Sequence, residues 1–136
     1  ESSSMKAIAK AGVTSSGVAY RQDIRTGNHQ LVADEPPDHG GLDAGPAPYD
    51  LLLAALGACT SITLEMYAQK KGWTLGQLRV DLTFFKNKEG ESRIERVLHV
   101  TEPLSEEQWA RLIEVAGKTP VTKTLLAGAP ITTTAG

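Results

Sequence analysis

The chain has 136 residues, of which 40% are hydrophobic and 5% aromatic, and its formal net charge is −2. This length suits one domain with its own core, which the scarcity of aromatics predicts to be built from Ala, Leu, Val and Ile. A slightly acidic chain lacks the basic face that nucleic acid or an anionic membrane requires, and its longest apolar run is far shorter than the roughly 20 residues that cross a bilayer. We therefore expect neither nucleic acid nor a membrane as partner.

The N-terminal residues indicate where the domain begins, and the cysteine content indicates the cellular compartment. Residues Glu1 to Ser4 precede Met5 and look like an expression scar, so we predict a single domain over residues 5–136. We see no series of charged, apolar and small residues of the kind that indicates a signal peptide. Cys59 is the only cysteine. Because it has no partner for an internal disulfide, we expect a reducing, cytoplasmic location.

The first third of the chain is typical of strands. Lys6 to Val13 alternates small apolar and polar residues, Ser15-Ser16-Gly17 predicts a turn, and Val18 to Ile24 predicts a second strand. Thr26-Gly27-Asn28 tolerates positive φ before Gln30 to Ala33 resumes an extended pattern, which indicates a hairpin.

Asp34 to Pro48 differs sharply in composition, with three Gly and four Pro in fifteen residues. This composition predicts a long loop, and loops of this length inside a compact domain are uncommon and often functional. The glycines do not indicate a phosphate site, because no Gly-Lys-Ser/Thr follows and Pro46 and Pro48 remove backbone donors.

The longest predicted helix starts at Pro48, where a missing N–H costs nothing, and Asp50 suits its positive first turn. It should run to about Lys71 and end at Gly72. Mostly apolar residues recur at spacings of three and four and define one face of the helix, which is predicted to be buried. Its members are Leu52, Ala55, Leu56, Cys59, Ile62, Thr63 and Met66.

The segment after the long helix predicts a hairpin. Gln77 to Phe84 alternates strictly between apolar and polar residues, Asn87 to Glu91 turns the chain, and Arg93 to Val100 returns with a second strand pattern. Ile131 to Thr134 is expected to add an edge strand near the end of the chain.

Two further helices are expected between the hairpin and the last strand. Ser105 with Gln108 three residues later forms a capping box, and Gly117 closes the helix that it opens. Thr119 as N-cap and Pro120 at the first position open a short helix to Ala127. The whole pattern predicts an α+β domain.

Most searches for reactive groups find nothing. His29, His39 and His99 are far apart and lack partners at metal-ligand spacing, so we expect neither a metal nor a cofactor. Cys-x-x-Cys, Gly-x-Ser-x-Gly and Gly-x-Gly-x-x-Gly motifs are absent from the sequence. Any covalent chemistry therefore depends on Cys59. From spacing alone this thiol is either an inert core residue or a protected nucleophile.

Several motifs taken together carry a family resemblance. They are Asp34-Glu35-Pro36, Gly40-Gly41, Gly45-Pro46, Pro48-Tyr49-Asp50-Leu51-Leu52, Leu56-Gly57-Ala58-Cys59-Thr60, Thr63-Leu64, Met66-Tyr67-Ala68, Lys71-Gly72-Trp73 and Thr119-Pro120-Val121-Thr122-Lys123-Thr124-Leu125. The chain resembles the OsmC/Ohr family, the osmotically inducible and organic hydroperoxide resistance proteins, and within it the OsmC-like redox-protein branch. The resemblance covers nearly all of the chain after the first strands.

The resemblance implies a fold, an assembly and an activity. The implied fold has antiparallel sheets around a long central helix, in an intertwined homodimer with two sites at the subunit interface. The implied activity is thiol-dependent reduction of hydroperoxides, preferentially organic ones, in oxidative-stress defence, with Cys59 as the peroxidatic cysteine. A thiolate attacks the terminal peroxide oxygen, an alcohol or water leaves, and the sulfur becomes a sulfenic acid.

The sequence departs from the family pattern at two positions. The hydroperoxide reductases have a second cysteine before the Pro-Val of the late helix, and here Thr119 stands there, so a catalytic cycle requires an external thiol or pairing between chains. The enzymes also carry a glutamate in the first turn of the central helix, whereas this chain has Pro48-Tyr49-Asp50.

A cation near Cys59 is expected to activate the thiol. The helix dipole fades within the first turn and burial disfavours a thiolate, so the charge must come from elsewhere. Arg21, Arg25 and His39 are the candidates, with Glu35 or Asp50 to orient an arginine. Each of these residues also has an ordinary explanation, as a solvated charge or as part of a loop or helix start.

Three functions are compatible with these observations. The first is a hydroperoxide reductase with one cysteine and an external thiol reductant. The second is a binding module that takes a hydrophobic small molecule without turnover. The third is a redox sensor in which oxidation of Cys59 changes a partner interaction.

Overall fold

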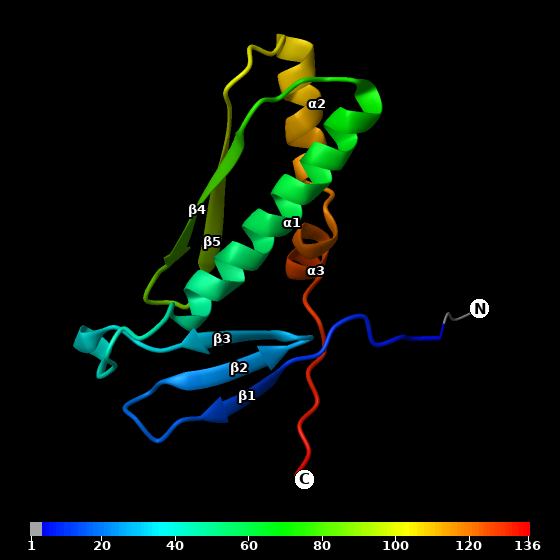
Figure 1. Ribbon diagram of the computed structural model, residues 1–136. Helices are drawn as coiled ribbons and strands as arrows, with labels where there is room; N and C mark the ends of the chain where they lie inside the picture. Colours follow the sequence, from blue (N-terminus) through cyan, green and yellow to red (C-terminus); the bar gives the residue numbers. More distant parts are fainter. Residues whose placement is uncertain (1–3) are drawn as a thin grey trace. The chain divides into compact units, whose positions relative to one another are not determined.

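A computed structural model describes residues 4–136, so residues 1–3 of the predicted expression scar lie outside the described part. The fold is α+β, with two antiparallel sheets and a long helix, as predicted (Figure 1). Contacts divide the chain into two compact units, which meet in sequence between Leu51 and Leu52. We call them unit 1 and unit 2 and describe each separately. The extent of a single domain over residues 5–136 stays a prediction.

Unit 1 contains a three-stranded sheet of β1 (Gly12–Ser15), β2 (Gln22–Thr26) and β3 (His29–Ala33) in that spatial order. Each neighbouring pair is antiparallel. The first two strands begin later than predicted, because the ladder between β1 and β2 starts at Gly12 and a turn with positive φ at Gly17 and Ala19 precedes β2.

The loop after β3 is ordered around one carboxylate. Asp34 is 2% exposed, and its two carboxylate oxygens accept the backbone N–H groups of Glu35, Leu42 and Ala44 at 2.8–3.2 Å. A Cβ at Gly41 would overlap the carbonyl oxygen of Glu35, so only glycine allows this close approach. The single regular element is a 3₁₀ turn, η1 (Pro37–His39). The loop that composition predicts is therefore a tightly hydrogen-bonded structure.

The long helix α1 (Pro48–Lys71) has the predicted ends. Asp50 accepts the N–H of Ala47 at its start, and Gly72 terminates it with a φ of 71°. Its buried face is different from the predicted one: the buried residues are Leu56, Thr60, Leu64 and Ala68. The prediction was wrong for Ala55, which is exposed, and for Ile62 and Met66, which are 51% and 63% exposed. The sequence pattern could not choose a face because apolar residues occur on several sides of α1.

By length and composition α1 is also the one helix in residues 4–136 that could cross a membrane. Core helices of soluble proteins pass the same test, since a helix that is apolar on all sides needs cover on all sides. This observation is weak evidence for a membrane span.

Unit 2 continues with the hairpin of β4 (Leu78–Lys86) and β5 (Ser92–Val100), then α2 (Glu106–Ala116) and α3 (Pro120–Ala127). The predicted hairpin and the capping box of Ser105 and Gln108 are confirmed. A core cluster joins α1 to α2 and to the residues before β4: Leu64, Ala68, Leu75, Leu112 and Ala116. Ile131 to Thr134 do not form the predicted edge strand, because no strand in the described residues pairs with them.

Candidate thiol site

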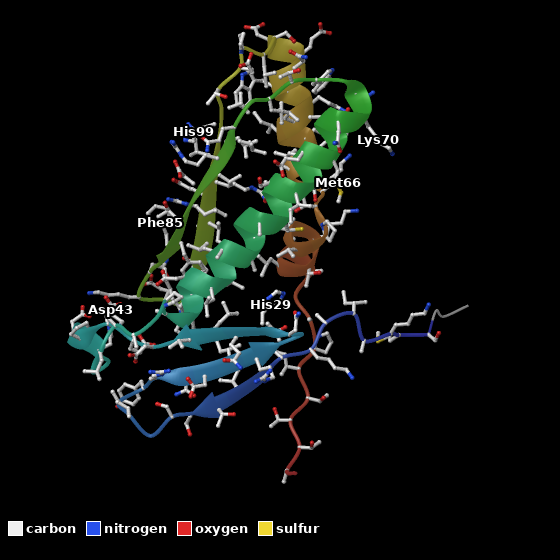
Figure 2. The ribbon with its side chains drawn as sticks, in the orientation of Figure 1. His29, Asp43, Met66, Lys70, Phe85 and His99 are labelled. Carbon is white, nitrogen blue, oxygen red and sulfur yellow. The ribbon has the colours of Figure 1, made fainter. Side chains whose placement is uncertain are left out.

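Cys59 is half-buried near the middle of α1 and is a free thiol. The next residue, Thr60, is completely buried on the packed face of the helix. Ile62 and Met66 lie about one turn and two turns further along on the exposed side, and Figure 2 shows Met66 on the side of α1 away from the β4–β5 hairpin. The thiol therefore lies at the border between the core and an exposed apolar stripe.

Arg96 brings a positive charge to the core side of this border. It belongs to β5, where Ile94, Arg96 and Leu98 are half-buried and the residues between them are exposed. Its Nη1 donates to Thr60 Oγ1 at 2.8 Å and to Thr122 Oγ1 at 2.9 Å. Arg96 thus connects β5 to α1 and α3, at the residue that follows Cys59.

Thr119, at the position of the second cysteine of the family pattern, belongs to the same cluster. It is completely buried, and its hydroxyl lies 2.6 Å from the hydroxyl of Thr122. Its backbone has the extended N-cap conformation, as predicted, but its side chain makes no capping hydrogen bond. Its hydroxyl bonds to Thr122 instead of to the backbone of the first turn. We call Thr60, Thr119 and Thr122 the threonine cluster.

The charge of Arg96 is not matched by an acid. Within residues 4–136 no carboxylate lies within 4.0 Å of its guanidinium, and its hydrogen-bond partners are the two neutral hydroxyls. Burial lowers the pKa of Arg96 below its ordinary value, and the nearby Cys59 acts in the opposite direction. Arginine remains protonated at neutral pH even after such a shift. The cluster therefore holds a permanent positive charge within electrostatic range of Cys59.

A groove of about 840 Å³ opens beside this cluster within unit 2. Its walls are mostly apolar, with Leu52, Phe84, Trp109 and Ile113 among them, and Arg96 and Thr122 also line it. A groove with apolar walls and few polar groups suits a small apolar molecule with a polar end.

Three of the candidate residues in unit 1, Arg21, His39 and Asp50, have local side-chain partners. Arg21 forms an exposed ion pair with Asp23 at 3.2 Å, and Arg25 is exposed on β2. Asp50 caps the start of α1 through Ala47, and Glu35 is half-buried. Their predicted role beside Cys59 stays a prediction.

The structure brings some of the unit 1 residues together around Asp34. A pocket of about 490 Å³ is lined by Tyr20, Asp34, Glu35 and His39, among others. The N–H of Ala44 lowers the pKa of Asp34, burial opposes this, and the other backbone donors and Arg21 lower it further. In the described part of the chain no three His, Cys, Asp or Glu side chains are placed to hold a metal ion.

Sequence reasoning missed Arg96, although a signal for it exists. In Arg93 to Val100 the inner positions of the alternating pattern are Ile94, Arg96, Leu98 and Val100, so one arginine occupies a position where an apolar residue is expected. A charge on the buried face of a strand is unusual enough to single out. What the sequence could not give is its neighbours, because Thr60 and Thr122 are 36 and 26 residues away.

The fold and the site together define an α+β protein with a single half-buried thiol near its core. Comparisons with known proteins identify the family. The family described as OsmC-like protein matches residues 39–134, so the chain belongs to this family. Three similar solved structures share 19–22% sequence identity with it. They are an OsmC-like protein from Mycoplasma pneumoniae (22% identity, TM-score 0.77, covering 90% of this chain and 89% of that one), an organic hydroperoxide resistance protein OsmC from Legionella pneumophila (19%, 0.64, 88% and 91%) and an organic hydroperoxide resistance protein from Elizabethkingia anophelis with thiocyanate bound (19%, 0.63, 88% and 89%). At these identities they show a shared fold. A search of curated protein sequences gives no match.

Proposed function

We propose that this protein reduces organic hydroperoxides with Cys59 as its peroxidatic residue and an external thiol as reductant. The observation that carries the proposal is the half-buried thiol of Cys59, one residue before the threonine that binds the Arg96 guanidinium, in a chain of the OsmC-like family. A nearby cation favours the thiolate, which is the nucleophilic form. Arg96 also lines an apolar groove that would accommodate an alkyl group, and Cys59 itself does not line this groove.

The proposed cycle has two halves. The Cys59 thiolate attacks the terminal oxygen of ROOH, the O–O bond breaks, and the alkoxide leaves and takes a proton to become ROH, while the sulfur becomes a sulfenic acid. An external thiol R′SH then displaces water to form a mixed disulfide, and a second R′SH releases R′SSR′ and the Cys59 thiol. The sum is ROOH + 2 R′SH → ROH + R′SSR′ + H₂O.

The external thiol is required because Thr119 cannot form a disulfide. Its buried hydroxyl bonds to Thr122, and Cys59 is the only cysteine of the chain. We therefore propose a small dithiol or a protein thiol as reductant, which fits a reducing, cytoplasmic setting. A cycle of this kind requires neither metal nor cofactor.

The decisive test is peroxide consumption by purified protein with dihydrolipoamide or dithiothreitol. Wild-type protein should consume cumene hydroperoxide, and Cys59→Ser should reduce the rate at least about 100-fold, since no other side chain replaces the nucleophile. Ser61→Ala, two residues away on α1, is the matched control and should retain the wild-type rate. Equal rates for Cys59→Ser and wild type would refute the proposal.

We also propose that the functional form is a homodimer. The predicted buried face of α1 is exposed in the single chain at Ile62 and Met66, with Cys59 at its edge. A helix that is apolar on several sides needs further cover, and a second copy of α1 offers a self-complementary stripe. Light scattering should give twice the chain mass of 14.5 kDa. Met66→Glu should shift the protein toward monomer, whereas Glu107→Gln, at an exposed position in the first turn of α2, should not.

The groove also favours a second candidate function, the binding of an apolar small molecule without turnover. Its volume of about 840 Å³ and apolar walls suit such a ligand. Native mass spectrometry with added cumyl alcohol or a similar apolar probe should then show a bound species in a protein that consumes no peroxide. Absence of both binding and turnover would leave a redox sensor, which dimedone trapping of oxidised Cys59 would detect.

A further inference from the structure

The groove in unit 2 combines apolar walls with charged residues of one sign. Among the described residues that line it, the charged ones are Arg93 and Arg96, and none is Asp or Glu. The rest of the wall is mostly apolar and comes from α1, the β4–β5 hairpin, α2 and α3. A concave apolar surface of about 840 Å³ with a cation in its wall suits a ligand that has an apolar body and an anionic end.

The two arginines of the groove differ in how far their charge is already matched. Arg93 is 66% exposed, pairs with Glu95 at 3.0 Å and lies over the ring of Phe85. Arg96 is half-buried, and no carboxylate among residues 4–136 lies within 4.0 Å of its guanidinium. Because a half-buried cation without an acidic partner is costly, an anionic ligand would gain more from Arg96 than from Arg93.

The hydrogen bonds of Arg96 leave one edge of its guanidinium open. Nη1 donates to Thr60 Oγ1 at 2.8 Å and to Thr122 Oγ1 at 2.9 Å, which uses both of its N–H groups. Within residues 4–136, Nε and Nη2 have no hydrogen-bond partner. These two nitrogens form the edge that presents parallel N–H groups, which is the geometry that the two oxygens of a carboxylate accept.

We infer that the groove binds an amphiphilic monocarboxylate, with the carboxylate on the Nε–Nη2 edge of Arg96 and the alkyl chain along the apolar walls. The inference deepens the second candidate function and rests on it, because both require that the groove holds a small molecule. It adds the head group that selects the ligand.

The hydroxyls that hold Arg96 are themselves fixed. Thr60 Oγ1 donates to the Leu56 carbonyl at 2.7 Å, and Thr122 Oγ1 donates to the Ala116 carbonyl at 3.3 Å. Because both hydroxyl protons are engaged, both oxygens accept from Arg96 in a defined direction. Thr60 and Thr122 are therefore positioning residues, and a guanidinium that is oriented in advance lowers the ordering cost of binding.

The test is isothermal titration of the purified protein with decanoate and, in parallel, with 1-decanol, which has the same chain without the charge. Decanoate should bind at one molecule per chain and at least about tenfold more tightly than decanol, because hydrogen bonds to a charged group are among the stronger ones. Octanoate should bind roughly tenfold more weakly than decanoate, since two methylenes leave the apolar wall.

Variants of the two arginines separate the head group from the chain. Arg96→Met should lower the affinity for decanoate to about that for decanol, and unchanged decanol binding would show that the groove is intact. Arg96→Lys keeps the charge without the parallel donors and should give an intermediate affinity. Arg93→Met is the matched control and should keep the preference for decanoate. Ile113→Glu, at a groove position that is 61% exposed, should weaken both ligands.

Several results would overturn the inference. Equal affinities for decanoate and decanol would leave the second candidate function without a carboxylate site, and tighter binding of decyl phosphate would assign the site to another anion. Loss of the preference in Arg93→Met as in Arg96→Met would indicate a general charge effect. Absence of binding by either ligand, as when a second copy fills the groove, would refute both the inference and the second candidate function.

Peroxide consumption is measured separately and keeps the two proposed functions apart. A protein that consumes cumene hydroperoxide and binds no decanoate would refute this inference and leave the reductase function standing. A protein that binds decanoate through Arg96 and consumes no peroxide would support the inference and refute the reductase function.

Discussion

Unit 1 contains a buried carboxylate, Asp34, and unit 2 contains a half-buried guanidinium, Arg96, and the two charges are held in opposite ways. The carboxylate of Asp34 accepts three backbone N–H groups, so its charge is matched by donors that belong to the loop it organises. The guanidinium of Arg96 uses one nitrogen on two hydroxyls and has no acid within 4.0 Å in residues 4–136. A charged group whose hydrogen-bonding capacity is filled, as in Asp34, stabilises the surrounding structure. A charged group such as Arg96, with neutral partners only, can still interact with another charge.

The largest expected effect is on the loop that surrounds Asp34. Gly41→Ala should destabilise the protein by about 3 kcal/mol or more, because the added Cβ overlaps the backbone carbonyl of Glu35, which cannot move without breaking the loop. Urea unfolding measures the change. Gly12→Ala, where a Cβ meets nothing within 4 Å, is the control and should stay close to wild type.

A smaller loss is expected when the Asp34 charge is removed. Its folded-state pKa is lowered from an ordinary value of 3.8, chiefly by the Ala44 N–H, so its contribution is present above about pH 4 and is lost as the pH falls through the lowered value. Asp34→Asn should lower Tm at pH 7 and lose less further stability below pH 4 than wild type. Asp43→Asn, an exposed position in the same loop, tests whether any loop carboxylate behaves this way. Parallel acid curves for wild type and Asp34→Asn would contradict the assignment.

The smallest stability change is expected at Arg96. Arg96→Met should alter the free energy of unfolding by no more than about 1 kcal/mol, because loss of two hydrogen bonds is offset by removal of a half-buried, unpaired charge. The hydroxyls of Thr60 and Thr122 keep the carbonyls of Leu56 and Ala116 as partners. Thermal unfolding measures this change. A loss as large as that of Asp34→Asn would mean that both charges are structural.

Local signals predicted the elements of this chain well. Pro48 and Gly72 mark the ends of α1, Ser105 and Gln108 mark the start of α2, and strict alternation marks β4 and β5. Each of these signals acts within a few residues. The first strands and the end of the chain were predicted less well, because a ladder exists only where a second strand offers partners, as at Gly12 opposite Arg25.

The candidate site was predictable only in part. Cys59 follows from elimination and from the family motifs, and the structure adds that it is half-buried. Arg96 has a local signal in its strand pattern, yet nothing local connects it to α1 or α3. The threonine cluster has no sequence signal as a cluster, because its members are ordinary residues separated by long stretches of chain.

The sequence by itself determined the family, the long helix, the hairpin and the single thiol, since composition, caps and periodicity act over short distances. Only the tertiary structure decided which face of α1 is buried and which arginine binds the threonines beside that face. Helix periodicity allowed several apolar faces, and packing against α2 and the hairpin selected the one that contains Thr60. That selection brings Arg96 and Thr122 together at Thr60, directly beside the thiol in sequence.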